Sequence, residues 1–149
     1  MARTDSSAAE LSLLALLQRA VRWFQDGLTE GMTNAGVEPI TPAHMLVLGH
    51  LRSRDPISIA ELARLAGVTR QTMHRAVGQL DREGLVTVDQ AAGYPRTAQV
   101  RITATGADRR TRATRILATL EAELGSVLGS EATRQLRATL ASPWPDSRQ

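Results

Sequence analysis

The fold of this chain is decided by residues 57–85, which read ISIAELARLAGVTRQTMHRAVGQLDREGL. Residues 58–61 form a capping box that begins a short helix, and Gly67 ends that helix. Thr69 is the expected N-cap of the next helix, which ends at Gly84. Two helices joined by a short turn that contains glycine predict a helix-turn-helix.

Apolar residues recur at helical spacing in both helices, so each helix has one face that we expect to be buried. In the first helix the inward set is Leu62, Ala63 and Leu65. In the second helix the inward set is Met73, Ala76, Val77 and Leu80. The opposite face of the second helix is therefore available to a partner.

The outward face of the second helix suits DNA recognition. It comprises Arg70, Gln71, His74, Arg75 and Gln79. Arginine can bind guanine, and glutamine can bind adenine, through paired hydrogen bonds in the major groove. Thr69 and Thr72 lie at the helix start, where hydroxyls and backbone amides can hold a phosphate. Each arginine taken alone is equally well explained as a solvated residue, whereas the group favours DNA contact.

A β-hairpin is predicted after the helix-turn-helix. Residues 85–88 and 98–102 are β-favouring stretches of alternating character, and the tip between them includes Gly93 and Pro95. Arg96 also lies at this tip, where a guanidinium could enter a minor groove. A loop with one exposed charge is the alternative explanation for Arg96.

Two helices are predicted on the N-terminal side. Residues 7–10 form a capping box, and the helix that follows carries an apolar stripe and ends at about Asn34. The stripe consists of Leu14, Leu17, Val21, Phe24 and Leu28. Thr41 and Pro42, as N-cap and first helical residue, begin a second helix that ends near Arg52.

Two further helices are predicted on the C-terminal side. Thr105 caps a long helix with Asp108 in its first turn. Its apolar stripe consists of Ala113, Leu117, Leu120, Leu124 and Val127. After a break at about Gly129 a final amphipathic helix follows, and residues 142–149 are expected to form a disordered tail.

The order of these elements predicts a mainly α fold. It is a winged helix-turn-helix with a small β-hairpin wing, flanked by N- and C-terminal dimerisation helices. The terminal helices carry more apolar surface than one small winged helix can cover, and a second copy would cover it with two-fold symmetry. Packing on the core of the same chain is the alternative. We predict a homodimer, with a helical dimerisation region at 1–37 and 104–141 and a DNA-binding domain at 38–103.

The charge is concentrated in the middle of the chain. The 149 residues carry a formal net charge of +3, and the basic residues other than histidine are all arginine, as GC-rich codon usage would produce. Residues 64–115 hold ten arginines against four acidic residues. A basic middle between mildly acidic ends is expected of a module that binds a polyanion, although an unevenly charged solvated surface has the same composition.

The composition also excludes several classes of protein. Without cysteine there is no disulfide framework, thiolate metal site or cysteine redox sensor. Three histidines without clustered carboxylates or a glycine-rich phosphate loop leave little for catalysis, so we predict no enzyme, metal or cofactor. Because no apolar run is long enough to cross a bilayer and the start is unlike a signal peptide, we expect a cytoplasmic protein with no membrane contact.

Five stretches together resemble the MarR family of bacterial transcriptional regulators. They are residues 41–44, 57–63, 67–75, 80–86 and 102–106. The resemblance implies a homodimer that binds a palindromic operator in double-stranded DNA, usually as a repressor. It also implies that a small anionic or phenolic ligand releases the DNA, as in many members of the family. This expectation agrees with the dimer and the DNA contact inferred from the residues alone.

The resemblance also assigns roles to individual residues. The recognition-helix role falls on Arg70, Gln71, His74 and Arg75, and the wing-tip role falls on Arg96. The wing of the family usually reads Asp-x-Arg, whereas Tyr94 occupies the acidic position here. Arg96 therefore lacks the carboxylate that would orient it.

Four residues lie on elements that would line a ligand crevice: Arg22, Trp23, His44 and His50. An arginine beside an aromatic ring could bind a small aromatic or anionic effector. Such a tryptophan is more often part of the core or of a dimer interface, and a lone histidine is more often a satisfied surface or core residue. The alternative function is a winged-helix adaptor that binds a protein and no specific DNA.

Overall fold

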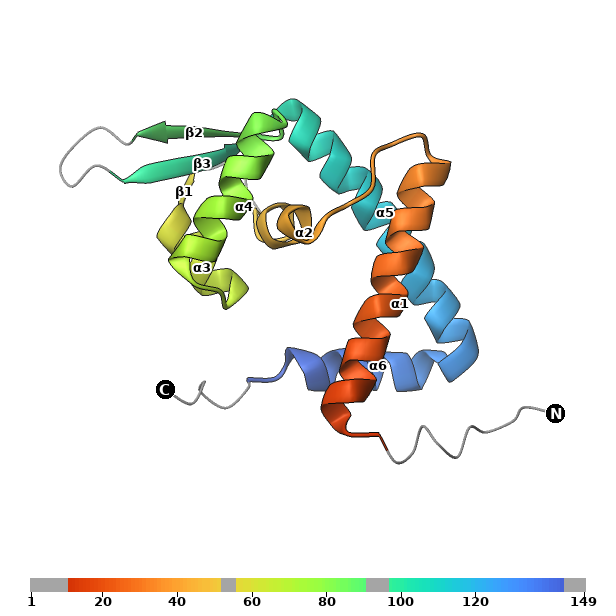
Figure 1. The fold of residues 1–149 in the computed structure, drawn as a ribbon. Coiled ribbons are helices and arrows are strands. Elements are labelled where there is room, and N and C mark those ends of the chain that lie inside the picture. The colour runs from red at the N-terminus through yellow and green to blue at the C-terminus, as the bar shows by residue number, and fades with distance from the viewer. Residues whose placement is uncertain (1–10, 52–55, 91–96, 144–149) are drawn as a thin grey trace.

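The computed structural model describes residues 11–51, 56–90 and 97–143. Helices and short strands form two lobes, a winged-helix lobe with the sheet and a lobe of long terminal helices (Figure 1). In chain order the elements are α1 (Leu13–Asn34), α2 (Pro42–Leu48), β1 (Ile57–Ser58), α3 (Ile59–Ala66), α4 (Arg70–Arg82), β2 (Val86–Gln90), β3 (Ala98–Ile102), α5 (Ala104–Leu128) and α6 (Ser130–Ala141). The predicted mainly α winged-helix fold is confirmed.

The sheet of the winged-helix lobe contains one strand that the sequence did not reveal. The strand order is β1-β3-β2, and both pairings are antiparallel. β1 is only two residues long, and Ile57 pairs with Val100 of β3. Because β1 runs directly into α3, this pairing attaches the hairpin to the helix-turn-helix.

The inward face predicted for α4 is confirmed in full, since Met73, Ala76, Val77 and Leu80 are all buried. In α3, Leu62 and Ala63 are buried as predicted, but Leu65 is 47% exposed. The prediction for Leu65 is wrong because the buried face of α3 begins at Ile59. The residues three, four and seven positions after Ile59 are Leu62, Ala63 and Ala66, and Leu65 is not among them.

Two helix starts differ from the prediction. Ser12, and not the 7–10 capping box, caps α1 and accepts a hydrogen bond from the Ala15 amide at 3.2 Å; residues 7–10 lie outside the described ranges. Thr103, and not Thr105, caps α5, because its hydroxyl accepts from the Gly106 amide at 3.0 Å and donates to the Gly84 carbonyl at 2.8 Å. The start of α5 is therefore set by its attachment to the end of α4.

The end of α2 also differs. The helix ends at Leu48, where the prediction was near Arg52. The amides of His50 and Leu51 both donate to the Val47 carbonyl, so the chain leaves the helix in a tight turn. Residues 52–55 and the 91–96 wing tip with Tyr94 and Arg96 lie outside the described residues, as does most of the predicted tail.

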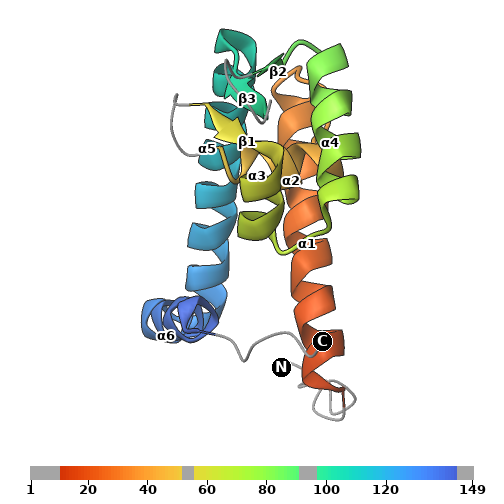
Figure 2. The same ribbon diagram turned by 90° about the vertical axis from the view of Figure 1, so that its left-hand side faces the viewer.

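α1 and α5 pack against each other, and α5 passes behind α1 in the view of Figure 1. Two glycines of α1 make the close approach possible. A Cβ atom at Gly27 would lie 2.7 Å from a methyl of Leu120, and one at Gly31 would lie 2.7 Å from a methyl of Ile116. α6 crosses the far end of α5 and is held there by an ion pair between Arg137 and Glu121 (Figure 2).

The terminal helices leave much apolar surface uncovered. The exposed large apolar side chains of α1, α5 and α6 include Leu13, Leu14, Val21, Val127, Leu128, Leu136 and Leu140. Within the described residues, no side chain of α6 is buried. No helix in the described ranges is long and apolar enough to span a membrane.

Candidate nucleic-acid interface

The start of α4 is fixed by a side-chain cap. Thr69 has an extended backbone, and its hydroxyl oxygen accepts from the Thr72 amide at 3.1 Å. The hydroxyl oxygens of Thr69 and Thr72 are 2.9 Å apart. The two threonines that the sequence places at a phosphate-binding position thus lie together at the exposed N-terminus of α4.

The outward face of α4 begins one residue later. Arg70, Gln71, His74 and Arg75 are all exposed, while the apolar face of the same helix is buried in the core. Within the described part of the chain, neither Arg70 nor Arg75 has an ion-pair partner. The first two turns of α4 therefore present two unpaired guanidinium groups, an amide and an imidazole to solvent.

The neighbouring helix α3 is electrostatically different. Arg64 donates to both carboxylate oxygens of Glu61, at 3.0 and 2.5 Å. The hydrogen bond from Arg64 lowers the pKa of Glu61 below its ordinary value, although slight burial opposes the shift. The positive charge of α3 is neutralised within the helix, so the free positive charge of the helix-turn-helix lies on α4.

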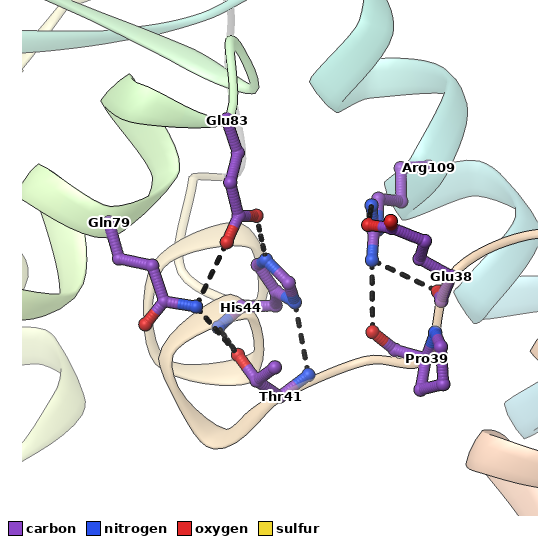
Figure 3. A network of polar contacts seen from close by, with 7 residues as sticks. All are labelled: Glu38, Pro39, Thr41, His44, Gln79, Glu83 and Arg109. Atoms are coloured by element: carbon purple, nitrogen blue, oxygen red, sulfur yellow. Dashed lines mark hydrogen bonds and ion pairs between the residues drawn. The ribbon is translucent and has the colours of Figure 1, made fainter.

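Gln79 differs from these four residues because it is half-buried. Its side-chain amide donates to the Glu83 carboxylate at 3.0 Å and to the Thr41 hydroxyl at 3.5 Å (Figure 3). Both partners lie on the side of α4 that faces α2. The base-reading position expected for Gln79 is therefore replaced by a contact between helices.

His44 is buried, with only 2% of its surface exposed. Its Nδ1 accepts from the Thr41 backbone amide at 3.0 Å, and its Nε2 contacts the Glu83 carboxylate (Figure 3). Since Nδ1 accepts, Nε2 carries the proton and donates to Glu83. His44 thus serves as a structural cap of α2, and both ring nitrogens are unavailable to a ligand.

These contacts determine the charge state of Glu83. Partial burial alone would raise the pKa of this carboxyl, but hydrogen bonds from Gln79 and His44 outweigh burial and hold the pKa below the ordinary value of 4.5. Thr41, His44, Gln79 and Glu83 form what we term the cap network. It connects the N-terminus of α2 to the C-terminus of α4.

Arginines at the start of α5 hold the backbone of other segments. One Arg109 nitrogen donates to the carbonyls of both Glu38 and Pro39, each at 2.9 Å (Figure 3). Arg110 donates to the Leu51 carbonyl. Part of the positive charge in the middle of the chain therefore serves internal contacts and is not available to a polyanion.

A groove lies between α1 and α2, with a volume of about 190 Å³. Its walls are Gln25, Leu28, Thr29, Ile40, Pro42 and Met45. None of the four residues that the sequence suggested for a ligand crevice belongs to this lining. The sequence predicts charged and aromatic residues at a ligand site, whereas most of the groove wall is apolar. Two of the wall residues, Ile40 and Pro42, lie where the connecting segment enters α2.

The four predicted crevice residues have other positions. Trp23 is 40% exposed and contacts Phe24 edge to face, with the ring centroids 4.9 Å apart. His50 forms a hydrogen bond from its Nδ1 to the Leu46 carbonyl at 2.9 Å. Arg22 is exposed on α1, one helical turn before Gln25 of the groove. His44, as described above, is enclosed in the cap network.

Known proteins resemble the chain in sequence and in structure. The family model described as MarR family matches residues 38–93. A MarR family protein from Mycobacterium tuberculosis, solved in complex with p-aminosalicylic acid, is 27% identical, with 87% of this chain and 96% of that chain covered and a TM-score of 0.60. No curated protein matches the chain.

More distant structures share the fold. Apo MarR from E. coli is 22% identical, with 87% of this chain and 95% of that chain covered and a TM-score of 0.67. CouR from Rhodococcus jostii, bound to p-coumaroyl-CoA, is 15% identical, with 93% and 96% covered and a TM-score of 0.70. The chain therefore has the winged helix-turn-helix fold of these solved structures, and its residues 38–93 match the MarR family.

Proposed function

We propose that this chain is a transcriptional regulator that binds double-stranded DNA by placing the start of α4 in the major groove. The exposed, unpaired face formed by Arg70, Gln71, His74 and Arg75 carries the proposal. These side chains project from the N-terminal half of a helix whose other face is fixed in the core, as direct readout of bases requires. The capped N-terminus at Thr69 and Thr72 is available to a backbone phosphate.

The proposed regulator acts as a homodimer on a palindromic operator. The uncovered apolar side chains of α1, α5 and α6 support this assembly, because a second copy would remove them from water. The division into a dimerisation region at 1–37 and 104–141 and a DNA-binding domain at 38–103 belongs to this proposal. Two-fold symmetry would place the two α4 helices about one turn of DNA apart, roughly 34–36 Å.

The groove between α1 and α2 is the proposed effector site. Its volume of about 190 Å³ fits a single aromatic ring, since a cavity of about 150 Å³ accommodates benzene. Structures of a relative in complex with p-aminosalicylic acid and with salicylic acid support an aromatic acid. Arg22, one turn from Gln25, is the nearest predicted crevice residue that could meet a carboxylate at the edge of this groove.

Repression is the proposed direction of control. A regulator that occupies a promoter without further contacts blocks transcription, and the family expectation is the same. A reporter gene fused to the protein's own upstream region tests the direction. Expression of the protein is expected to lower reporter output, and salicylate is expected to restore it; an increase on expression would identify an activator.

Fluorescence anisotropy with the same upstream DNA tests the base-reading role of α4. Arg75→Ala is expected to weaken specific binding about tenfold to 100-fold, because it removes one bidentate base contact. Arg19→Ala is the matched control, since Arg19 is exposed on α1 and its loss changes the net charge equally. Affinity should fall as salt rises. Equal affinity of Arg75→Ala and wild type would refute this role, and absence of binding to any duplex would favour the adaptor.

A further inference from the structure

The segment that joins α1 to α2 is held from two sides. On one side, Arg109 of α5 donates to two consecutive carbonyls of this segment, those of Glu38 and Pro39. The Arg109 side chain is only 11% exposed, and it also faces the Glu38 carboxylate at 3.8 Å. The middle of the segment is therefore fixed to α5.

On the other side, the cap network holds the segment to α4. Thr41 donates its amide to the His44 ring and accepts through its hydroxyl from the His44 amide at 3.3 Å. The opposite side of the imidazole contacts Glu83, the C-cap residue of α4 (Figure 3). A movement of Thr41 therefore moves the His44 ring and alters its contact with the end of α4.

The groove between α1 and α2 lies between these two attachments. Ile40 and Pro42 line the groove, and they flank Thr41 along the chain. A molecule in the groove would contact Ile40 and Pro42, which are covalently bonded to Thr41. Because Arg109 restrains Pro39, the displacement would be taken up on the Thr41 side.

The cap network can respond to a displacement of Thr41 by switching between two arrangements of the His44 ring. The Thr41 amide can bond to Nδ1 only when the imidazole lies in one orientation, and Nε2 then points at Glu83. If the bond from the Thr41 amide is lost, Nδ1 is a buried acceptor without a donor, which costs free energy. The ring would therefore turn, and the contact between Nε2 and Glu83 would be lost as well. Such a bistable contact can convert a small shift into a change at another site.

We propose that the cap network couples the occupancy of the groove to α4, with His44 and Glu83 as positioning residues that hold the recognition helix. The inference rests on the proposed function and specifies how its effector site reaches the DNA-binding helix. It assigns His44 a role in transmission, where the sequence suggested a role in ligand contact.

Because the chain contains no cysteine, a single introduced cysteine can be labelled selectively. Such a label can fill the groove without knowledge of the natural ligand. Thr29→Cys places the only thiol in the groove, and benzyl methanethiosulfonate attaches an aromatic ring to it by a disulfide that dithiothreitol removes. Thr119→Cys on the exposed surface of α5 is the matched labelling control. Hydrogen exchange of the amides of residues 79–85 then reports on the end of α4, in the full chain and without DNA.

Labelling of the Thr29→Cys protein is expected to speed exchange at residues 79–85 about fivefold or more, and dithiothreitol should reverse the change. In a Glu83→Ala background the label should change exchange at residues 79–85 less than about twofold. In a Glu83→Gln background the label should again speed exchange, because glutamine can still accept a hydrogen bond from His44. Asp81→Ala removes an equal charge from the same helix end and should leave the response intact.

Three results would overturn the proposal. They are no response to the label in the Thr29→Cys protein, a full response in the Glu83→Ala background, or equal loss of the response in Asp81→Ala. DNA affinity measured on the same samples is a separate test. Coupled exchange without any DNA binding would refute the proposed function and leave the coupling standing, whereas DNA binding without coupled exchange would refute only the coupling.

Discussion

The two lobes of the molecule differ in how completely one chain covers its own apolar surface. In the winged-helix lobe, Leu62, Met73 and Leu80 are entirely buried. In the terminal helices, Leu14 and Val127 are 65% and 81% exposed. The lobe proposed to read DNA is therefore complete within one chain, whereas the terminal helices have an apolar face that a second copy would cover.

The largest effect is expected when charge is placed on the uncovered apolar face of the terminal helices. Leu14→Asp combined with Val127→Asp is expected to convert a dimer to a monomer and raise its dissociation constant by more than about 10³-fold. The change affects both side chains in each of the two copies, and full burial of such a side chain contributes about 1.5–3 kcal/mol. Sedimentation velocity over a range of concentrations measures the change.

Leu65→Asp is the control for this prediction, because Leu65 is a similarly exposed apolar residue on the winged-helix lobe. It should leave the oligomeric state unchanged. A wild-type chain that remains monomeric at high concentration, or an equal effect of Leu65→Asp, would contradict the comparison between the lobes.

Two glycines test the packing where α5 meets the winged-helix lobe and where α5 meets α1. A Cβ atom at Gly106 would overlap the backbone carbonyl of Leu85, which cannot move without disturbing the start of α5. Gly106→Ala is therefore expected to lower the free energy of unfolding by about 1–3 kcal/mol. Urea denaturation at fixed protein concentration measures the loss.

Gly31→Ala is the matched substitution between α1 and α5. Its Cβ would meet only the side chain of Ile116, which can adjust, and alanine gains about 1 kcal/mol of helix propensity over glycine. Its net effect should be smaller than that of Gly106→Ala. The reverse order would show that the contact between the terminal helices is the more rigid of the two.

The smallest expected effect concerns the cap network between α2 and α4. Because the pKa of Glu83 is lowered in the folded chain, its ionised form stabilises the fold above the ordinary value of 4.5, and this contribution is lost as the pH falls through the folded pKa. Glu83→Gln should therefore cost less than about 1 kcal/mol at pH 7 and progressively less below 4.5.

Urea denaturation across this pH range measures the difference. Asp81→Asn removes a carboxylate from the same turn and is the matched control. A cost of Glu83→Gln that grows on acidification would contradict the assigned sign.

Features that depend on the local spacing of apolar residues can be predicted from the sequence. The buried set of α4 follows from spacing alone, because one helix face must meet the core. The contacts of His44 with Glu83 and of Gln79 with Thr41 were missed because these partners lie 39 and 38 residues away along the chain, and no local pattern encodes such a pairing. The same reason explains Thr103, which caps α5 while it holds the carbonyl of Gly84. The groove was missed because its walls are mainly ordinary apolar residues.

The uncovered face of the terminal helices has a consequence for gene dosage. If DNA binding requires two copies, the number of active pairs at low abundance rises with the square of the number of chains, so halving synthesis lowers it about fourfold. A promoter controlled in this way responds steeply to how much regulator the cell makes. The apolar stripe of α1 and α6 would then set a threshold of expression, before any small molecule is bound.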